Sequence, residues 1–168
     1  MHPTIRPERP ADIAAIARLT EAAFRDAAHT SHTEAFIVDA LRRAGQLTLS
    51  LVAEEDGRLV GHVAISPVAI SSGAKNWFGL GPISVAPDRQ GRGIGTRLMN
   101  AALENLRGQH AAGCVVLGDP AFYGRFGFAV QPDMRLPGVP PDYFQVLAFG
   151  AAVPDGDVSY HEAFNATE

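Results

Sequence analysis

Cysteine is almost missing from the sequence: Cys114 is the single one, inside the apolar run CVVL. A lone cysteine cannot form a disulfide bond within its chain, which excludes the disulfide-stabilised secreted scaffolds. No general base stands beside Cys114 in the sequence. We therefore interpret its thiol as a buried structural group and not as a nucleophile.

The sequence also lacks long apolar runs and an excess of positive charge. No run approaches the length of a membrane span, and the N-terminal MHPTIRPERP has no apolar signal core, so we expect a cytoplasmic protein without a membrane partner. Fourteen basic against eighteen acidic side chains give a net charge of −4. Nucleic-acid-binding domains usually carry a basic excess, so we expect no nucleic-acid partner.

Apolar residues are frequent enough for a packed core, at 46% of the 168 residues against 19% charged ones. We expect a single domain over residues 1–168. Hydrophobic periodicity predicts a short strand, two helices, a run of antiparallel strands, and then strand, helix, strand, helix and strand. This order predicts an α/β fold of the mixed α+β kind, with helices on both faces of a mixed sheet.

Three local signals mark the ends of elements. The dipeptide Asp56-Gly57 joins two strand-like runs and favours a tight hairpin turn. Ser31 and Glu34 have the spacing of a capping box at the start of the second helix, and Gly45 ends that helix.

The run NWFGLGPISV is an unusual strand. Gly79, Gly81 and Pro82 do not fit a regular central strand, because glycine weakens the ladder and proline cannot donate to it. We therefore predict a bulge or a splayed edge at this point of the sheet.

Residues 84–98, SVAPDRQGRGIGTRL, place three glycines and three arginines between this strand and a helix expected over residues 93–107. A P-loop needs Gly-Lys-Ser or Gly-Lys-Thr, whereas Gly95-Thr96 here has no lysine. A dinucleotide fingerprint that starts at Gly91 needs a third glycine where Thr96 stands. Both nucleotide-binding motifs are excluded, and a glycine-rich helix entry with solvated arginines is the structural alternative.

Gln90-Gly91-Arg92-Gly93-Ile94-Gly95 fits the pattern Q/R-x-x-G-x-G/A at the start of a helix. The first amides of a helix have no partners within it and lie at the positive end of its dipole, so they bind anions. The glycines leave these amides uncovered, and Arg89 and Arg92 add positive charge. The pattern therefore favours a diphosphate site.

With LGPISVAP before it and GDPAFYGRFGF after it, this motif resembles the GNAT superfamily of N-acetyltransferases. The resemblance covers about residues 3–149 and is most specific over residues 80–128. It implies a GNAT-like sheet with a splayed strand and acetyl-coenzyme A (acetyl-CoA) as co-substrate, without a metal. The coenzyme-binding residues that it implies are Ile83, Ser84, Val85, Arg89, Gln90, Gly91, Arg92, Gly93, Ile94, Gly95, Thr96 and Tyr123.

The resemblance also implies how the coenzyme lies and reacts. Its pyrophosphate would rest on the amides of residues 90–96, and its pantetheine arm would pair with the backbone of residues 83–85. The acceptor would be a primary amine of a small molecule or a protein, and it would attack directly. Tyr123 matches the tyrosine that acts as general acid to the thiolate; its structural alternative is an aromatic core residue.

The general base is less defined by the sequence. Ser84 stands where many relatives carry a glutamate, and we count it with Tyr123 as a catalytic residue, although a hydroxyl is too weak a base alone. This departure favours a water relay or an amine that arrives neutral. Glu54, His62 and Asp119 are further candidates for the general base. Their structural alternatives are an exposed charge on the hairpin for Glu54, a core histidine for His62 and a helix cap for Asp119.

His32, Glu34 and His62 are candidate residues for binding the acceptor. The structural alternative for Glu34 is a capping box with Ser31, and the structural alternative for His62 is a buried position in the core. A different class of function is a non-catalytic acyl-CoA-binding sensor or partner module, which the loop supports equally well. The sequence is compatible with a monomer or a homodimer.

Overall fold

The computed structural model describes residues 2–27, 30, 32–150 and 152–168, so the cap expected at Ser31 lies outside the described residues. The strands are β1 (Thr4–Pro7), β2 (Leu49–Glu55), β3 (Arg58–Ile70), β4 (Trp77–Val85), β5 (Gly113–Leu117), β6 (Met134–Arg135), β7 (Phe144–Ala148) and β8 (Gly156–Tyr160). The helices are α1 (Ile13–Phe24), α2 (Glu34–Arg43), α3 (Ile94–Gly108) and α4 (Pro120–Tyr123), and short 3-10 turns lie between elements.

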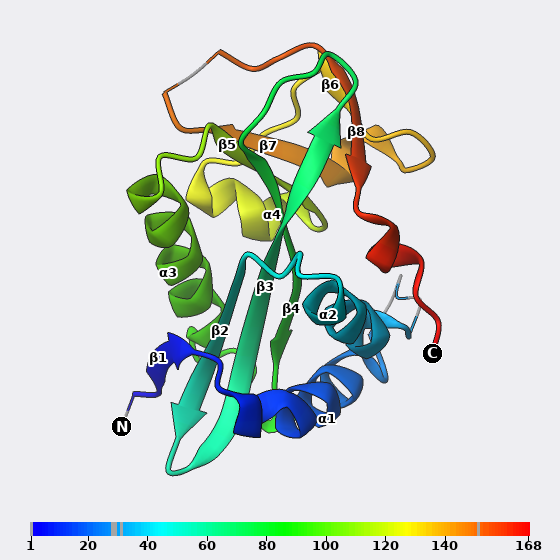
Figure 1. The fold of residues 1–168 in the computed structure, drawn as a ribbon. Coiled ribbons are helices and arrows are strands. Elements are labelled where there is room, and N and C mark those ends of the chain that lie inside the picture. Colours follow the sequence, from blue (N-terminus) through cyan, green and yellow to red (C-terminus); the bar gives the residue numbers. More distant parts are fainter. Residues whose placement is uncertain (1, 28–29, 31, 151) are drawn as a thin grey trace.

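An eight-stranded sheet in the order β1-β2-β3-β4-β5-β7 runs through the molecule, and β8 joins it by pairing with β3 and β6. Neighbouring strands are antiparallel except for the parallel pairs β4–β5 and β6–β8. The helices cover both faces (Figure 1). The predicted fold class, a mixed and mostly antiparallel sheet between helices, is confirmed.

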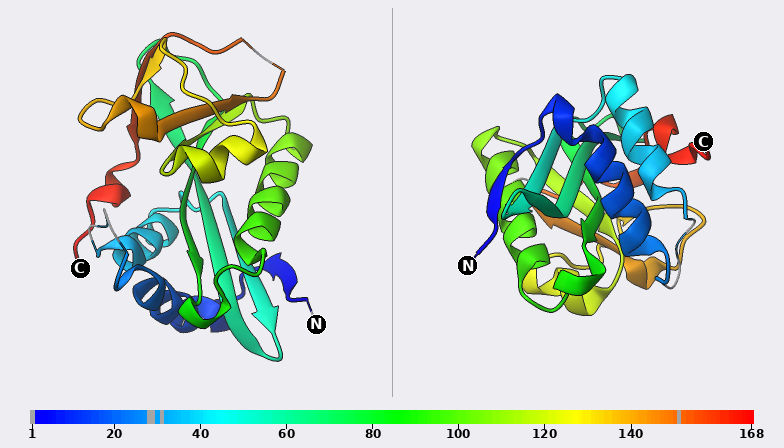
Figure 2. Two further views of the ribbon diagram at one scale, coloured as in Figure 1. Left: turned by 180° about the vertical axis from the view of Figure 1, so that it is seen from behind. Right: turned by 90° about the horizontal axis from the view of Figure 1, so that it is seen from below.

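Alternation along β2 shows how the two faces are filled. Leu51 and Ala53 are buried in the main core with Leu98 of α3. Val52, whose side chain points to the opposite face, packs against Ile16 of α1 and Val38 of α2. Seen from below, the sheet accordingly separates α3 from α1 and α2 (Figure 2).

The signals at Asp56-Gly57 and Gly45 are borne out, whereas α2 begins at Glu34 with Thr33 as its N-cap, later than a cap at Ser31 predicts. Asp56 and Gly57 both have positive φ, at 51° and 78°, as a type I′ hairpin turn requires. Gly45 follows α2 with φ 69°. Asp119 caps α4, since its Oδ1 accepts a hydrogen bond from the Ala121 amide at 2.9 Å.

The irregular strand predicted at residues 77–85 is β4, and it opens the sheet. It pairs with β5 only along Trp77–Gly79 and Gly113–Val115, after which the two strands diverge. On its other side the register with β3 shifts between Val63 and Ile65. The ring of Tyr160 fills the space that a Cβ on Gly79 would need. The predicted bulge and splay are both present.

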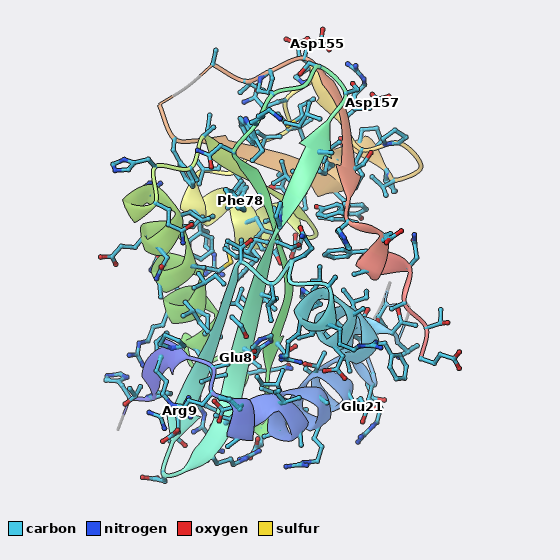
Figure 3. The ribbon with its side chains drawn as sticks, in the orientation of Figure 1. Glu8, Arg9, Glu21, Phe78, Asp155 and Asp157 are labelled. Atoms are coloured by element: carbon cyan, nitrogen blue, oxygen red, sulfur yellow. The ribbon has the colours of Figure 1, made fainter. Side chains whose placement is uncertain are left out.

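A second core lies at the other end of the sheet, around Trp77 and Phe144. There Arg135 bridges Asp155 and Asp157 at 3.2 and 3.0 Å, far from Glu8 at the opposite end (Figure 3). Cys114 is fully buried, and burial raises the pKa of its thiol, as expected for a structural cysteine. Among the described residues, no helix combines the length and apolar character that crossing a bilayer requires.

Candidate active site

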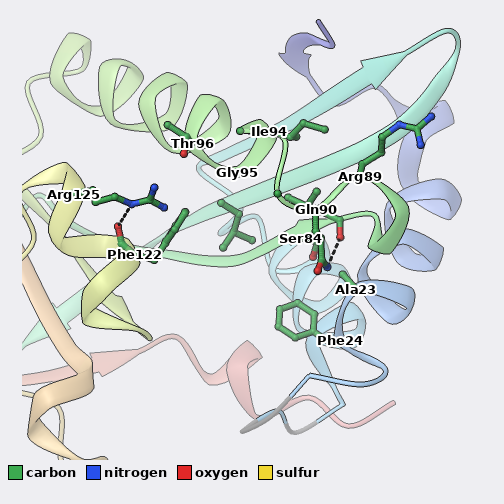
Figure 4. Close-up of a pocket in the computed structure, with 14 residues that line it drawn as sticks. Ala23, Phe24, Ser84, Arg89, Gln90, Ile94, Gly95, Thr96, Phe122 and Arg125 are labelled. Atoms are coloured by element: carbon green, nitrogen blue, oxygen red, sulfur yellow. Dashed lines mark hydrogen bonds between the residues drawn. The ribbon is translucent and has the colours of Figure 1, made fainter.

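A pocket of about 490 Å³ lies where β4 ends and α3 begins (Figure 4). It is bordered by four segments: the C-terminus of α1, the end of β4, the glycine loop with the first turn of α3, and the region of α4. The lining residues are Ala23, Phe24, Ile83, Ser84, Val85, Arg89, Gln90, Gly91, Gly93, Ile94, Gly95, Thr96, Phe122 and Arg125. Most of the residues implied for the coenzyme are thus brought together.

The N-terminus of α3 is open toward this pocket. Its N-cap is Gly93, which has φ 81° and no side chain that could accept from the helix amides. The first helical hydrogen bond runs from the Arg97 amide to the Gly93 carbonyl at 3.1 Å. The amides of residues 94–96 therefore have no partner within the helix, and with the positive end of the dipole they form an anion site.

Two contacts fix this anion site relative to the sheet. Gly61 of β3 lets α3 approach closely, because a Cβ there would come within 2.8 Å of the Leu98 side chain and 3.0 Å of Ile94. The side-chain amide of Gln90 donates to the Val85 carbonyl at 3.2 Å. The start of α3 is thereby packed on β3, and the glycine loop is held to β4.

The two arginines expected to add positive charge behave differently from that expectation. Arg89 lines the pocket, but its guanidinium bonds Glu55 at 2.9 Å and Asp88 at 3.0 Å and is turned away from Ser84 (Figure 4). Arg92 is exposed and does not contribute to the pocket lining. Glycine neighbours leave Arg92 free to extend into solvent, whereas Glu55 on β2 and the adjacent Asp88 hold the guanidinium of Arg89.

Arg125 supplies a cation that the sequence analysis missed. Its guanidinium lies 4.7 Å from the ring centre of Phe122, and both side chains line the pocket. The i, i+3 spacing within FYGR places the two on one side of a helical turn, which is the signal that could have revealed them. Ala23 and Phe24, at the end of α1, were missed as well.

Tyr123 lies next to the pocket but does not line it. It is 9% exposed and packs edge to face against Phe122 and Phe128, with ring centres 5.0 and 6.1 Å away. Its ring also covers Gly118, just after β5. Burial raises the pKa of Tyr123 to about 12, so the phenol is protonated at neutral pH.

The three residues predicted for the acceptor do not line the pocket. His32 is exposed, with φ 58°, and Glu34 accepts a hydrogen bond from the Thr30 hydroxyl at 2.6 Å. His62 is fully buried in β3, with Nε2 2.7 Å from the Ser50 hydroxyl. Within the described ranges no group of three or more His, Cys, Asp or Glu residues is arranged to hold a metal ion.

Comparison with known proteins agrees with this geometry. The family described as "Acetyltransferase (GNAT) domain" matches residues 4–131. The uncharacterized N-acetyltransferase YhbS of Escherichia coli K12 is 38% identical over 169 residues, covering 96% of this chain and 98% of the relative.

Solved structures give the same result. A GNAT family acetyltransferase from Brucella melitensis, solved in complex with acetyl-CoA, is 55% identical, with a TM-score of 0.87 and coverage of 97% of this chain and 98% of the other. The structure of E. coli YhbS in complex with CoA is 36% identical, with a TM-score of 0.88 and coverage of 100% and 94%. The chain therefore belongs to the GNAT family of acetyltransferases, which confirms the prediction of an acyltransferase.

Proposed function

We propose that this protein transfers the acetyl group of acetyl-CoA to a primary amine, of a small molecule or of a protein, in the cytoplasm. The observation that carries the proposal is the continuous pocket from residues 83–85 of β4 to the open N-terminus of α3. Two relatives that align over nearly the whole chain were solved with acetyl-CoA or CoA.

The residues present fit the coenzyme. The uncovered amides at the start of α3 suit the pyrophosphate, and Gly91 and Gly93 leave room for it, since no atom lies within 4 Å of a Cβ built on either. The backbone of residues 83–85 borders the opening between β4 and β5 and suits an extended pantetheine arm. Arg125 and Phe122 would flank the coenzyme on the α4 side.

The transfer forms a C–N bond to the amine and breaks the C–S bond of the thioester. A backbone amide within residues 83–85 would stabilise the oxyanion of the tetrahedral intermediate. We assign Tyr123 as the acid that protonates the departing thiolate. It packs against Gly118 at the end of β5, beside the opening of the sheet, and its raised pKa keeps the phenol protonated.

Thiol release from acetyl-CoA, measured with a panel of tyramine, spermidine and the peptide Ala-Ala-Ala, tests this function. We expect release that depends on one or more of these amines, together with an acetylated product by mass spectrometry. If acetyl-CoA binds and none of the amines is acetylated, the proposal is contradicted and a non-catalytic acyl-CoA-binding module is favoured instead.

A further inference from the structure

Three buried side-chain atoms in the described part of the chain have no hydrogen-bond partner: Nδ1 of His62, Oγ of Ser66 and Oγ of Ser84. Such atoms are uncommon in folded proteins and often mark a functional demand. His62 of β3 and Ser84 of β4 are directly opposite each other in the sheet register. They therefore share one face, the face that α1 and α2 cover.

His62 is the inner end of a chain of polar contacts. Its Nε2 lies 2.7 Å from the Ser50 hydroxyl, and that hydroxyl donates to Oε1 of Glu8. Glu8 in turn accepts two hydrogen bonds of 2.9 Å from Arg42 of α2. Glu8 follows β1 at the lower end of the sheet (Figure 3) and borders a second pocket of about 360 Å³.

The chain determines which nitrogen of His62 carries the proton. A carboxylate only accepts hydrogen bonds, so the Ser50 hydroxyl must give its proton to Glu8. Its oxygen then accepts from Nε2–H of His62. The neutral imidazole consequently keeps a lone pair on Nδ1, which is the buried atom without a partner.

Ser84 is opposite His62 in the register and is among the residues that line the coenzyme pocket, with its Oγ buried beneath the pocket surface. Opposed side chains in an antiparallel pair have Cβ atoms about 4.5–5.5 Å apart. A change of the Ser84 rotamer, or one water molecule, therefore suffices to join its hydroxyl to Nδ1 of His62. With that rotamer or water in place, the chain would extend from Ser84 through His62 and Ser50 to Glu8.

We propose that Ser84 and His62 act as the general base of the acetyl transfer, with Ser50 and Glu8 as positioning residues; the inference rests on the proposed function. As the C–N bond forms, the amine nitrogen loses a proton to Oγ of Ser84, and the Ser84 proton moves to Nδ1 of His62. The imidazolium is balanced by the Glu8 carboxylate through Ser50. After the product leaves, the proton returns through Ser84 to solvent in the pocket.

The electrostatics of the chain keep His62 neutral between turnovers, and Glu8 offsets part of the cost of a transient proton on it. Burial lowers the pKa of His62 to about 4, against the opposing effect of Glu8, and Arg42 lowers it further. The imidazole is therefore neutral at rest and able to accept. Although burial opposes it, hydrogen bonds from Arg42 and Ser50 hold the pKa of Glu8 below its usual range, so the countercharge is present. The elements facing His62 contribute Glu8 after β1, Ser50 on β2, Arg42 on α2 and Ser84 on β4.

The variant S50A tests this assignment, with S66A as its matched control. Ser66 is a fully buried serine on β3, the strand of His62, and lies outside the chain of contacts. With the panel amine that wild type acetylates fastest, we expect S50A to lower kcat about 10²-fold, the usual contribution of a positioned base. The KM of S50A for acetyl-CoA should stay within twofold of the wild-type value. The variant S50T, which keeps a hydroxyl, should restore kcat, and E8Q should lower kcat as S50A does.

A second measurement detects the tautomer independently of any acceptor. In ¹⁵N NMR of the full-length protein we expect Nε2–H and an unprotonated Nδ1 for His62, assigned by comparison with H62Q, and a mixture of tautomers in S50A.

Equal losses of kcat in S50A and S66A, or a wild-type His62 protonated on Nδ1, would overturn the base assignment alone. If wild type acetylates none of the panel amines, the proposed function fails and the base assignment falls with it.

Discussion

The side-chain amide of Gln90 donates a hydrogen bond to the backbone carbonyl of Val85 at 3.2 Å, and this contact holds the glycine loop against the last residue of β4. Val85 and Gln90 both line the pocket, one from the strand and one from the loop. The relation matters because the two proposed halves of the coenzyme site, the strand edge and the helix N-terminus, must keep a fixed separation to bind one extended ligand.

Replacing Gln90 by alanine should weaken coenzyme binding without unfolding the protein. The loss of one hydrogen bond that positions the loop corresponds to a roughly threefold to tenfold rise in the Kd for acetyl-CoA. Isothermal titration calorimetry measures this, with Gln109→Ala as control, because Gln109 is an exposed glutamine at the other end of α3. Equal Kd values for the two variants would show that the Gln90 contact has no part in binding.

The variant Gly93→Ala should lose both stability and binding, and Gly138→Ala should lose stability alone. Both glycines have positive φ, 81° and 86°, and a Cβ on either would meet no atom within 4 Å. Each substitution therefore lowers the free energy of unfolding by a similar amount, about 1 kcal/mol, because alanine is strained in the left-handed backbone conformation. Urea unfolding and acetyl-CoA titration separate the effects, and unchanged binding by Gly93→Ala would contradict an anion site at this helix end.

Removing the hydroxyl of Tyr123 should slow turnover and spare binding. We expect Tyr123→Phe to lower kcat about 10²-fold with the Kd for acetyl-CoA within twofold of wild type, because an acid acts on the leaving thiolate and not on the bound ground state. Tyr143→Phe, at a tyrosine that is 45% exposed, is the control. Since the pKa of Tyr123 is about 12, wild-type kcat should not fall through tyrosine ionisation between about pH 8 and pH 10. Wild-type turnover in Tyr123→Phe would refute the assignment.

Stability toward acid should depend on Asp12. Hydrogen bonds from Arg6 at 2.8 and 3.2 Å and from the Arg9 amide hold the pKa of Asp12 below its usual range. The unfolded chain then binds a proton at higher pH than the folded one, so this stabilisation is present above about pH 4 and lost as the pH falls below it.

Urea unfolding across about pH 3 to pH 6 measures this dependence. Asp12→Asn should lower stability at the upper end of that range and flatten the slope below pH 4. Asp88→Asn removes a carboxylate whose pKa is also lowered, by Arg58, but in a solvent-exposed pair, so it should flatten the slope much less than Asp12→Asn does. A wild-type slope in Asp12→Asn would contradict the account of Asp12.

Local sequence signals predicted the features that depend on backbone geometry. The glycine loop, the hairpin at Asp56-Gly57 and the irregular strand around Pro82 were all foreseen, because each requires a residue with an unusual dihedral angle or without an amide proton. Alternation along a strand also predicts which side of the sheet a residue faces. A buried core position was accordingly one of the two interpretations that the sequence allowed for His62.

Contacts between distant segments could not be predicted in the same way. Arg89 was expected at the phosphates, but its partner Glu55 lies on β2, thirty-four residues earlier in the sequence. The chain from Glu8 through Ser50 to His62 combines three segments whose register only the folded sheet defines. Arg125 entered the pocket because of how α4 packs, which local spacing alone does not determine.

The central claim is that acetyl-CoA binds between β4 and the start of α3. Thermal unfolding with acetyl-CoA, and with NAD and ATP as controls, tests it most directly. At a hundredfold excess over Kd, a ligand that binds only the folded state adds about 2.7 kcal/mol. For a domain of this size the midpoint should rise by roughly 5–11 °C with acetyl-CoA alone. No shift with acetyl-CoA, or equal shifts with all three ligands, would contradict the account.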